Sequence, residues 1–432
     1  MDGVTANTLR ISFLCLVLLA LLLGIEHGAY AQQAQGAPAE AFRPGVVSLF
    51  DLGLGQGYDD DAFGTGQGGY FTEVDPRLDF SQQREHGFWS LNLQPTIQRF
   101  YDFSVGDRVN EQASTTDLWE MSRRWTLDVN GNYLHSSDPL ARSESASGAQ
   151  PVGSSSVVAP NSSFIGPESP FTVFGGSSTL HYQAGRYTEL TFGGDYFNSR
   201  ENVSALPNTS SKALRAGYTK MVRRGQTIGL LYSGQFFDVV NPEEHVTTHS
   251  LLLSYDFAWK TGREISLFAG PQYSLVSASS GLSSGPSPTL AGINQDILAY
   301  AAGATLSIVI TRQNFFQFMT TRRIVDGAGV SGTEVQDQAQ LGLSRRFDKR
   351  VSASVASFYS EYQALGNLTA AAANGWGASA HADFNLAPRS RISFEYDYFH
   401  QSEISAAVAP LFAHNRALIE YHYSFGTLPG LR

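Results

Sequence analysis

Acidic residues and histidines recur at alternate positions in three segments near the end of the sequence. They are His381, Asp383, Glu395, Asp397, Glu420 and His422. A similar run near the beginning consists of Glu73, Asp75, Arg77 and Asp79. Residues two apart project from one face of an extended chain, so each run places its charges in a line. Such a line can attract cations along a path, or its members can satisfy one another as a polar ladder that fills space.

The segments that carry these charges show the period-two alternation of β-strands. Trp376, Ala378 and Ala380 alternate with small polar residues, and after positions 387–390 the pattern resumes with Ile392 and Phe394 on one face. Two such segments joined by a short turn predict an antiparallel hairpin.

About eighteen segments of this kind follow one another, and sixteen is the alternative count. They begin near Val46, Gly69, Gly87, Glu111, Trp125, Pro170, Tyr187, Ser211, Gln226, Thr247, Arg263, Gln295, Asn314, Glu334, Arg350, Ala373, Ser390 and Ala413. The connections are expected to alternate strictly between short and long. The pattern predicts an all-β fold: one antiparallel up-and-down transmembrane β-barrel spanning 45–432, with both termini in the periplasm.

The N-terminus has the features of an export signal. Arg10 precedes an apolar run at 11–24, and the small residues Ala29 and Ala31 precede a cleavage expected after Ala31. The sequence therefore predicts a signal peptide at 1–31 and a short periplasmic segment at 32–44. Cys15 is the only cysteine and lies in the signal, so disulfides and cysteine-bound metals are excluded.

Composition supports the same class of protein. The chain has 42 glycines, 12% aromatic residues and only 16% charged residues, and its apolar residues are dispersed. The net charge of −10 argues against nucleic acid as a partner. Aromatic residues gather at the expected strand ends, for example Trp259 near the short turns and Phe100, Trp376 and Tyr398 near the opposite rim. They predict two girdles at the membrane interfaces of a bacterial outer membrane.

Three stretches resemble the β-barrel porin family of bacterial outer-membrane proteins. The first is Leu-Gly-Leu-Gly-Gln-Gly-Tyr-Asp-Asp-Asp at 52–61, where Asp61 replaces the asparagine that the family often has. The second is Asp-Pro-Arg-Leu-Asp-Phe at 75–80, and the third is the last strand at 417–426. The resemblance covers most of the mature chain and implies an outer-membrane location and a barrel architecture.

A barrel of this size is wide enough for an aqueous channel. We expect its lumen to be lined by the two charged runs and by further charges at Asp128, Glu189, Asp195, Arg215, Asp256 and Glu264. The expected function is passage of hydrophilic solutes with a modest cation preference and no covalent chemistry. Expected partners are outer-membrane lipid, the barrel insertion machinery during biogenesis, and a solute or polysaccharide cargo. Substrate, direction of transport, an open or plugged lumen, and oligomeric state stay undetermined.

Three alternatives stay open. One is a barrel that exports exopolysaccharide as part of an assembly, and another is a non-conducting structural or adhesive barrel. The third is a membrane hydrolase, for which His245, His249 and His400 are the obvious bases.

Two further features are weaker candidates. Asp59, Asp60 and Asp61 offer carboxylate oxygens of the kind that divalent cations prefer, although a solvated acidic loop explains them better. The long loop at 136–169 either folds into the lumen or stays at the surface. No cofactor is expected.

Overall fold

The computed structural model describes residues 45–60, 68–101, 108–137, 171–201, 208–240, 244–260, 262–278, 293–326, 333–364, 372–402 and 412–427. The expected signal peptide, its cleavage site and the segment 32–44 lie outside the described residues, as do Asp61 and positions 138–169 of the long loop. The strands lie within the compact unit Ala39–Arg432. No helix in these ranges is long and apolar enough to cross a bilayer.

The described residues form eighteen strands. The first nine are β1 (Gly45–Asp59), β2 (Gly69–Arg84), β3 (Gly87–Phe100), β4 (Arg108–Ser122), β5 (Trp125–Ser136), β6 (Phe171–Gly185), β7 (Thr188–Glu201), β8 (Asn208–Arg223) and β9 (Gln226–Val240). The others are β10 (Glu244–Lys260), β11 (Arg263–Ala278), β12 (Ile293–Thr311), β13 (Asn314–Asp326), β14 (Thr333–Arg346), β15 (Val351–Ala364), β16 (Ala372–Ala387), β17 (Ser390–Gln401) and β18 (Phe412–Thr427).

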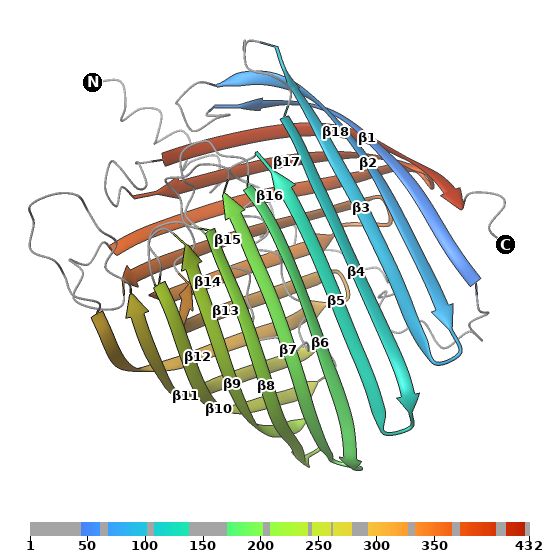
Figure 1. The fold of residues 1–432 in the computed structure, drawn as a ribbon. Helices are drawn as coiled ribbons and strands as arrows, with labels where there is room; N and C mark the ends of the chain where they lie inside the picture. The colour runs from blue at the N-terminus through green and yellow to red at the C-terminus, as the bar shows by residue number, and fades with distance from the viewer. Residues whose placement is uncertain are drawn as a thin grey trace, which may run out of the picture. The chain divides into compact units, whose positions relative to one another are not determined.

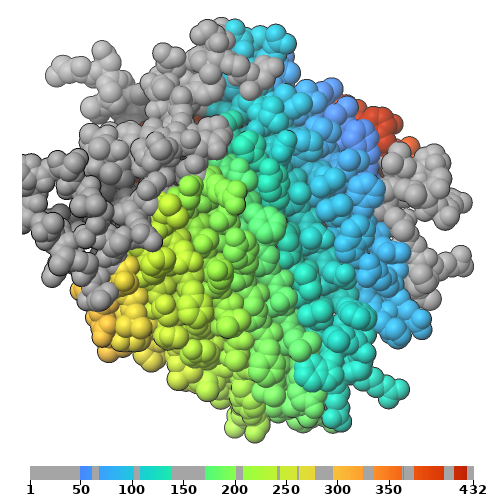
Figure 2. Space-filling view, in the orientation of Figure 1, coloured from blue at the N-terminus to red at the C-terminus, as the bar shows by residue number. Residues whose placement is uncertain are grey.

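Each strand pairs antiparallel with the next, and β1 also pairs with β18, so the sheet closes on itself. Figure 1 shows the strands following one another around the wall in chain order. Figure 2 shows part of the outer surface, where the colours pass from blue to yellow without a break. The predicted antiparallel up-and-down barrel is confirmed, with eighteen strands rather than sixteen.

The connections alternate with one exception. Most even-numbered strands lead into the next through two residues, such as Arg123 and Arg124 between β4 and β5. The connections at the other end are longer, but β9 and β10 are separated only by 241–243. The prediction of strict alternation is wrong there, because the pairing continues to Val239 opposite Glu244 and leaves no residues for a long loop.

The two faces of the wall differ in polarity. On β2, Glu73 and Asp75 are buried on the inner face, whereas Tyr70, an odd number of positions from both, is exposed on the outer face. Large apolar side chains on the outer face are open to the surroundings, including Leu214 at 64% and Leu298 at 77% exposure. The outer face of the wall is therefore apolar and the inner face is polar and charged.

The aromatic residues of the expected outer girdle divide between the faces. The rings of Trp376 and Tyr398 lie 4.7 Å apart on neighbouring strands, on the outer face. Phe100 instead faces inward and is buried with Phe71 and Leu418, so its assignment to the girdle is wrong. Its strand position has the parity of Gln98, a buried polar residue of the inner face.

The inner face of β1 is built from glycines where the barrel closes. Gly57 lies opposite Phe71 on β2 and opposite Leu418 on β18. A Cβ atom at Gly57 would lie 2.7 Å from Phe71 Cε1 and from the Ala417 carbonyl oxygen. Glycine is therefore required for the Phe71 ring to pack across β1.

We expect the substitution Gly57→Val to lower the free energy of unfolding by about 1–3 kcal/mol, because the new side chain displaces Phe71 and strains the seam. The measurement is urea unfolding of the protein in lipid vesicles, followed by tryptophan fluorescence. Gly342→Val is the matched control, since a Cβ atom at Gly342 meets nothing within 4 Å. Equal stability of the two variants would contradict this account of closure.

Candidate functional site

The predicted charged runs are brought together at the seam where the barrel closes. Gly55 on β1 lies opposite Glu73 on β2 and opposite Glu420 on β18. In the same way, Gly53 lies opposite Asp75 and His422. These glycines have no side chains, so charged groups from β2 and β18 extend over β1 from both sides. The charged residues of β2 and β18 thus meet over β1 and form one continuous group on the inner face, which we call the charged sector.

The carboxylates of β2 are held by donors from β3. Gln98 Nε2 donates to Glu73 Oε2 at 2.6 Å, and Thr96 Oγ1 donates to Asp75 Oδ1 at 3.0 Å. Glu73 is 7% exposed and Asp75 is 8% exposed. Buried carboxylates are costly without such partners. These contacts favour the polar-ladder interpretation for this part of the sector.

An arginine that the sequence prediction omitted controls the charge of β17. Arg416 on β18 lies opposite Asp397, and its Nη2 atom is 3.0 Å from Glu395 Oε1 and 3.3 Å from Asp397 Oδ2. Arg416 itself is 7% exposed. Two carboxylates therefore share one guanidinium group, and Arg391 stands farther along the same face of β17.

The histidines of the sector are paired with acids. His381 Nε2 lies 3.0 Å from Asp383 Oδ2 on the same strand. His422 lies 3.2 Å from both Glu420 and Asp51, and its Nε2 atom is 3.0 Å from Ser393 Oγ. The imidazoles thus link neighbouring carboxylates along the seam.

The remaining predicted lumen charges share the inner face but lie away from the seam. Arg215 on β8 bonds Asp195 on β7 at 2.5 Å. Glu189 accepts from His181 at 2.6 Å, and Asp128 accepts from Asn130 at 2.8 Å. Asp256 and Glu264 occupy the inner face of β10 and β11, in register with Ser266 and Ser307. These charges are distributed around the wall and do not form one site.

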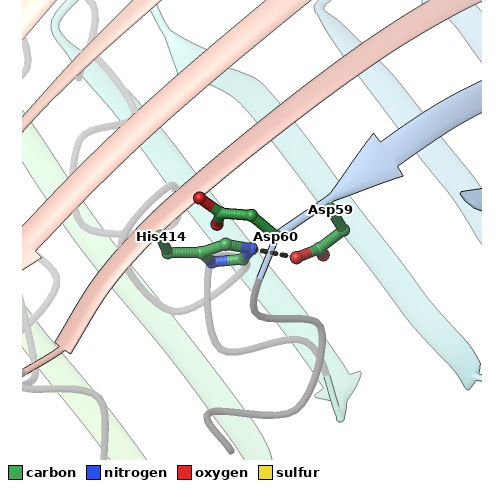
Figure 3. A group of neighbouring side chains, drawn as sticks. All are labelled: Asp59, Asp60 and His414. Carbon is green, nitrogen blue, oxygen red and sulfur yellow. Dashed lines mark hydrogen bonds and ion pairs between the residues drawn. The ribbon is translucent and has the colours of Figure 1, made fainter. Parts of the chain in front are cut away.

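Asp59 and Asp60 take part in a cluster with His414, whereas Asp61 lies outside the described residues. Figure 3 shows the His414 ring directed at the Asp59 carboxylate, with Asp60 beside it. One ligand atom from each of the three residues falls within 4.8 Å of the others, which is close enough to hold a cation. The same atoms already have protein partners, because His414 Nε2 donates to Asp59 and the backbone N–H of Asn415 donates to Asp60 at 2.6 Å.

The contacts of Asp59 and Asp60 with His414 and Asn415 join the end of β1 to the start of β18, and we call this group of side chains the clasp. Arg108, at the start of β4, also takes part: its Nη1 atom lies 3.9 Å from Asp59 Oδ2 and donates to Gln98 Oε1 at 3.2 Å. Asp59, Arg108 and His414 are almost completely buried. Imidazole, guanidinium and backbone donors already surround the carboxylates, which leaves a cation few free ligands. The burial of Asp59 contradicts the solvated acidic loop that the sequence favoured.

Three inner-face residues that the sequence analysis did not name, Asp51, His414 and Arg416, could have been found from strand parity. Arg416 stands four positions before Glu420 and His414 stands six positions before it, so both share its face on β18. Asp51 shares the face of Gly53 and Gly55 for the same reason. Arg108 was beyond reach, because the predicted fourth segment began only at Glu111 and β4 begins at Arg108.

The histidines considered for a hydrolase lie on the outer face of the wall. His245 is 2.7 Å from Asp238, and His249 is 2.9 Å from the Tyr232 hydroxyl, with its ring stacked on Tyr232. His400 packs against Trp376. These pairs stabilise outward-facing positions and do not converge on a common point in the described structure.

Comparison with known proteins gives only distant likenesses. No family model matches the sequence, and no curated protein does either. Among solved structures, OccK2 (OpdF) of Pseudomonas aeruginosa is 10% identical, with 88% of this chain and 98% of that chain covered and a TM-score of 0.43. OpdK of the same organism, solved with vanillate, is 10% identical, with coverages of 88% and 99% and a TM-score of 0.40.

The ferric-catecholate import receptor Fiu of E. coli K12 is 9% identical, with coverages of 88% and 81% and a TM-score of 0.45. At identities this low, these likenesses assign no substrate to the chain.

The substitution Arg416→Met removes the buried guanidinium that two partly buried carboxylates share. We expect Arg416→Met to lower the free energy of unfolding by about 3–5 kcal/mol, as for other buried ion pairs that lose one partner. The matched control is Arg77→Met, because Arg77 bonds Asp79 at 2.9 Å with about half of its side chain exposed. An exposed pair of this kind contributes about 0–1 kcal/mol. Urea unfolding in vesicles measures both, and similar losses would contradict the role of Arg416.

Proposed function

We propose that the protein is a bacterial outer-membrane channel for hydrophilic solutes. The observation that carries the proposal is the closed eighteen-strand sheet with an apolar outer face and a charged, polar inner face. A closed barrel satisfies every backbone group without water, and its outer side chains can meet lipid. Eighteen strands enclose a lumen of the width found in solute channels.

The proposed orientation places the short turns and both termini in the periplasm, and the longer connections outside the cell. The proposal includes entry into the membrane through export and barrel insertion. It assigns the barrel no covalent chemistry, because the inner charges are bonded to one another rather than directed at a reacting group.

Purified, folded protein should produce discrete conductance steps in planar lipid bilayers, because ions pass through a wet lumen. The absence of steps at every voltage tested would refute the channel and favour a non-conducting structural barrel. Unfolded protein added under the same conditions is the control for nonspecific leakage.

The acidic balance of the seam supports a modest preference for cations. Neutralising the sector with Asp383→Asn, Asp397→Asn and Glu420→Gln should shift the reversal potential in a salt gradient toward non-selectivity. The control is the triple variant Asp238→Asn, Asp296→Asn and Glu361→Gln, whose residues occupy the outer face of β9, β12 and β15. If both triple variants keep the wild-type reversal potential, the sector serves the scaffold only.

A further inference from the structure

A cavity of about 340 Å³ lies in the inner wall between β13 and β17. Its apolar side is formed by Met319, Phe358 and Phe399, and the two phenylalanine rings are stacked with centroids 6.0 Å apart. Gly342 also lines the cavity, and a Cβ atom there would meet nothing within 4 Å. The recess is therefore open space beside an aromatic surface, and its volume is at the small end for ligand sites.

The polar side of the recess carries negative charge. Glu395 and Asp397 line it and share the guanidinium of Arg416, so two carboxylates face one cation. His381 also lines the recess and is paired with Asp383. A positively charged solute would restore the balance of charge without breaking these contacts.

The recess also contains an unused donor. Gln340 lines it, and its Nε2 atom is buried without a hydrogen-bond partner among the described residues. A buried donor without a partner is costly, and an acceptor oxygen on a bound solute would remove that cost. The walls thus offer an aromatic surface, carboxylate acceptors and one amide donor.

From this arrangement we infer that the recess binds a small organic cation: a protonated amine with an apolar body and an oxygen acceptor. The amine lies toward Glu395 and Asp397, and the apolar body packs on Phe358, where a cation near the ring face gains further attraction. The oxygen accepts from Gln340. The inference rests on the proposed channel and names the class of solute that the channel retains during passage.

Calorimetric titration of the folded protein in nanodiscs tests the inference with two probes of one shape. At about pH 6 L-phenylalaninamide carries a protonated amine, the ring and a carbonyl oxygen, whereas 3-phenylpropanamide lacks only the amine and is neutral. We expect the cation to bind about tenfold more tightly. Equal affinity, or binding of glucose in place of the cation, would overturn the assignment.

Two variants locate the binding in the recess. Gly342→Leu fills the open space and should weaken L-phenylalaninamide binding by about tenfold. Gly185→Leu is the control and should leave binding unchanged. A Cβ atom at Gly185 also meets nothing within 4 Å, but Gly185 is the last residue of β6 and does not line the recess. Asp397→Asn should reduce the preference for the cation, and Asp256→Asn on β10 should leave it unchanged. Unchanged binding in Gly342→Leu would overturn the proposed site.

Conductance separates this inference from the proposed function. A conducting protein that binds neither probe would keep the channel and refute the recess as a cation site. A protein that binds the cationic probe more tightly than the neutral probe but never conducts would refute the channel and retain the recess as a cation site.

Discussion

Closure of the sheet is the constraint on which the rest of the structure depends. An open strand edge would leave a row of backbone N–H and C=O groups without partners, and β1 prevents this by pairing with both β2 and β18. The sequence meets this constraint with glycines on the inner face of β1. They let side chains from both neighbours cross the closing strand, and Phe71 and Leu418 pack there as a small apolar cluster. The seam is consequently sealed by side chains as well as by backbone hydrogen bonds.

The inner charges follow from the same geometry. Because Gly55 has no side chain, Glu73 of β2 faces Glu420 of β18 across β1. Asp75 faces His422 across Gly53 in the same way. Acids so close together need donors, and β3 supplies side-chain amides and a hydroxyl group to Glu73 and Asp75. The ladder and the ion-path interpretations are therefore compatible. The wall can be internally bonded and still carry an excess of negative charge toward the lumen.

Much of this architecture could be predicted from the sequence, because strand alternation is a local signal. Period-two patterns located every strand to within a few residues, and the face of each predicted lumen charge follows from its parity. The contacts between strands could not be predicted in the same way. Which acid meets which base depends on the stagger between strands, so the pairing of Arg416 with Glu395 and Asp397 could not be derived from one segment. The clasp of Asp59 with His414 joins positions 355 residues apart, at opposite ends of the barrel sequence.

Arg416 connects closure with the chemistry of the lumen. On β18 it stands in register with Asp59 of the clasp on one side and with Asp397 of the recess on the other. A single buried cation thus lies between β1 and the carboxylates of β17. A neutral residue here would remove the cation that Glu395 and Asp397 share and would make the inner face beside the seam more negative. The stability of the wall and the charge of its inner face are therefore coupled at this position.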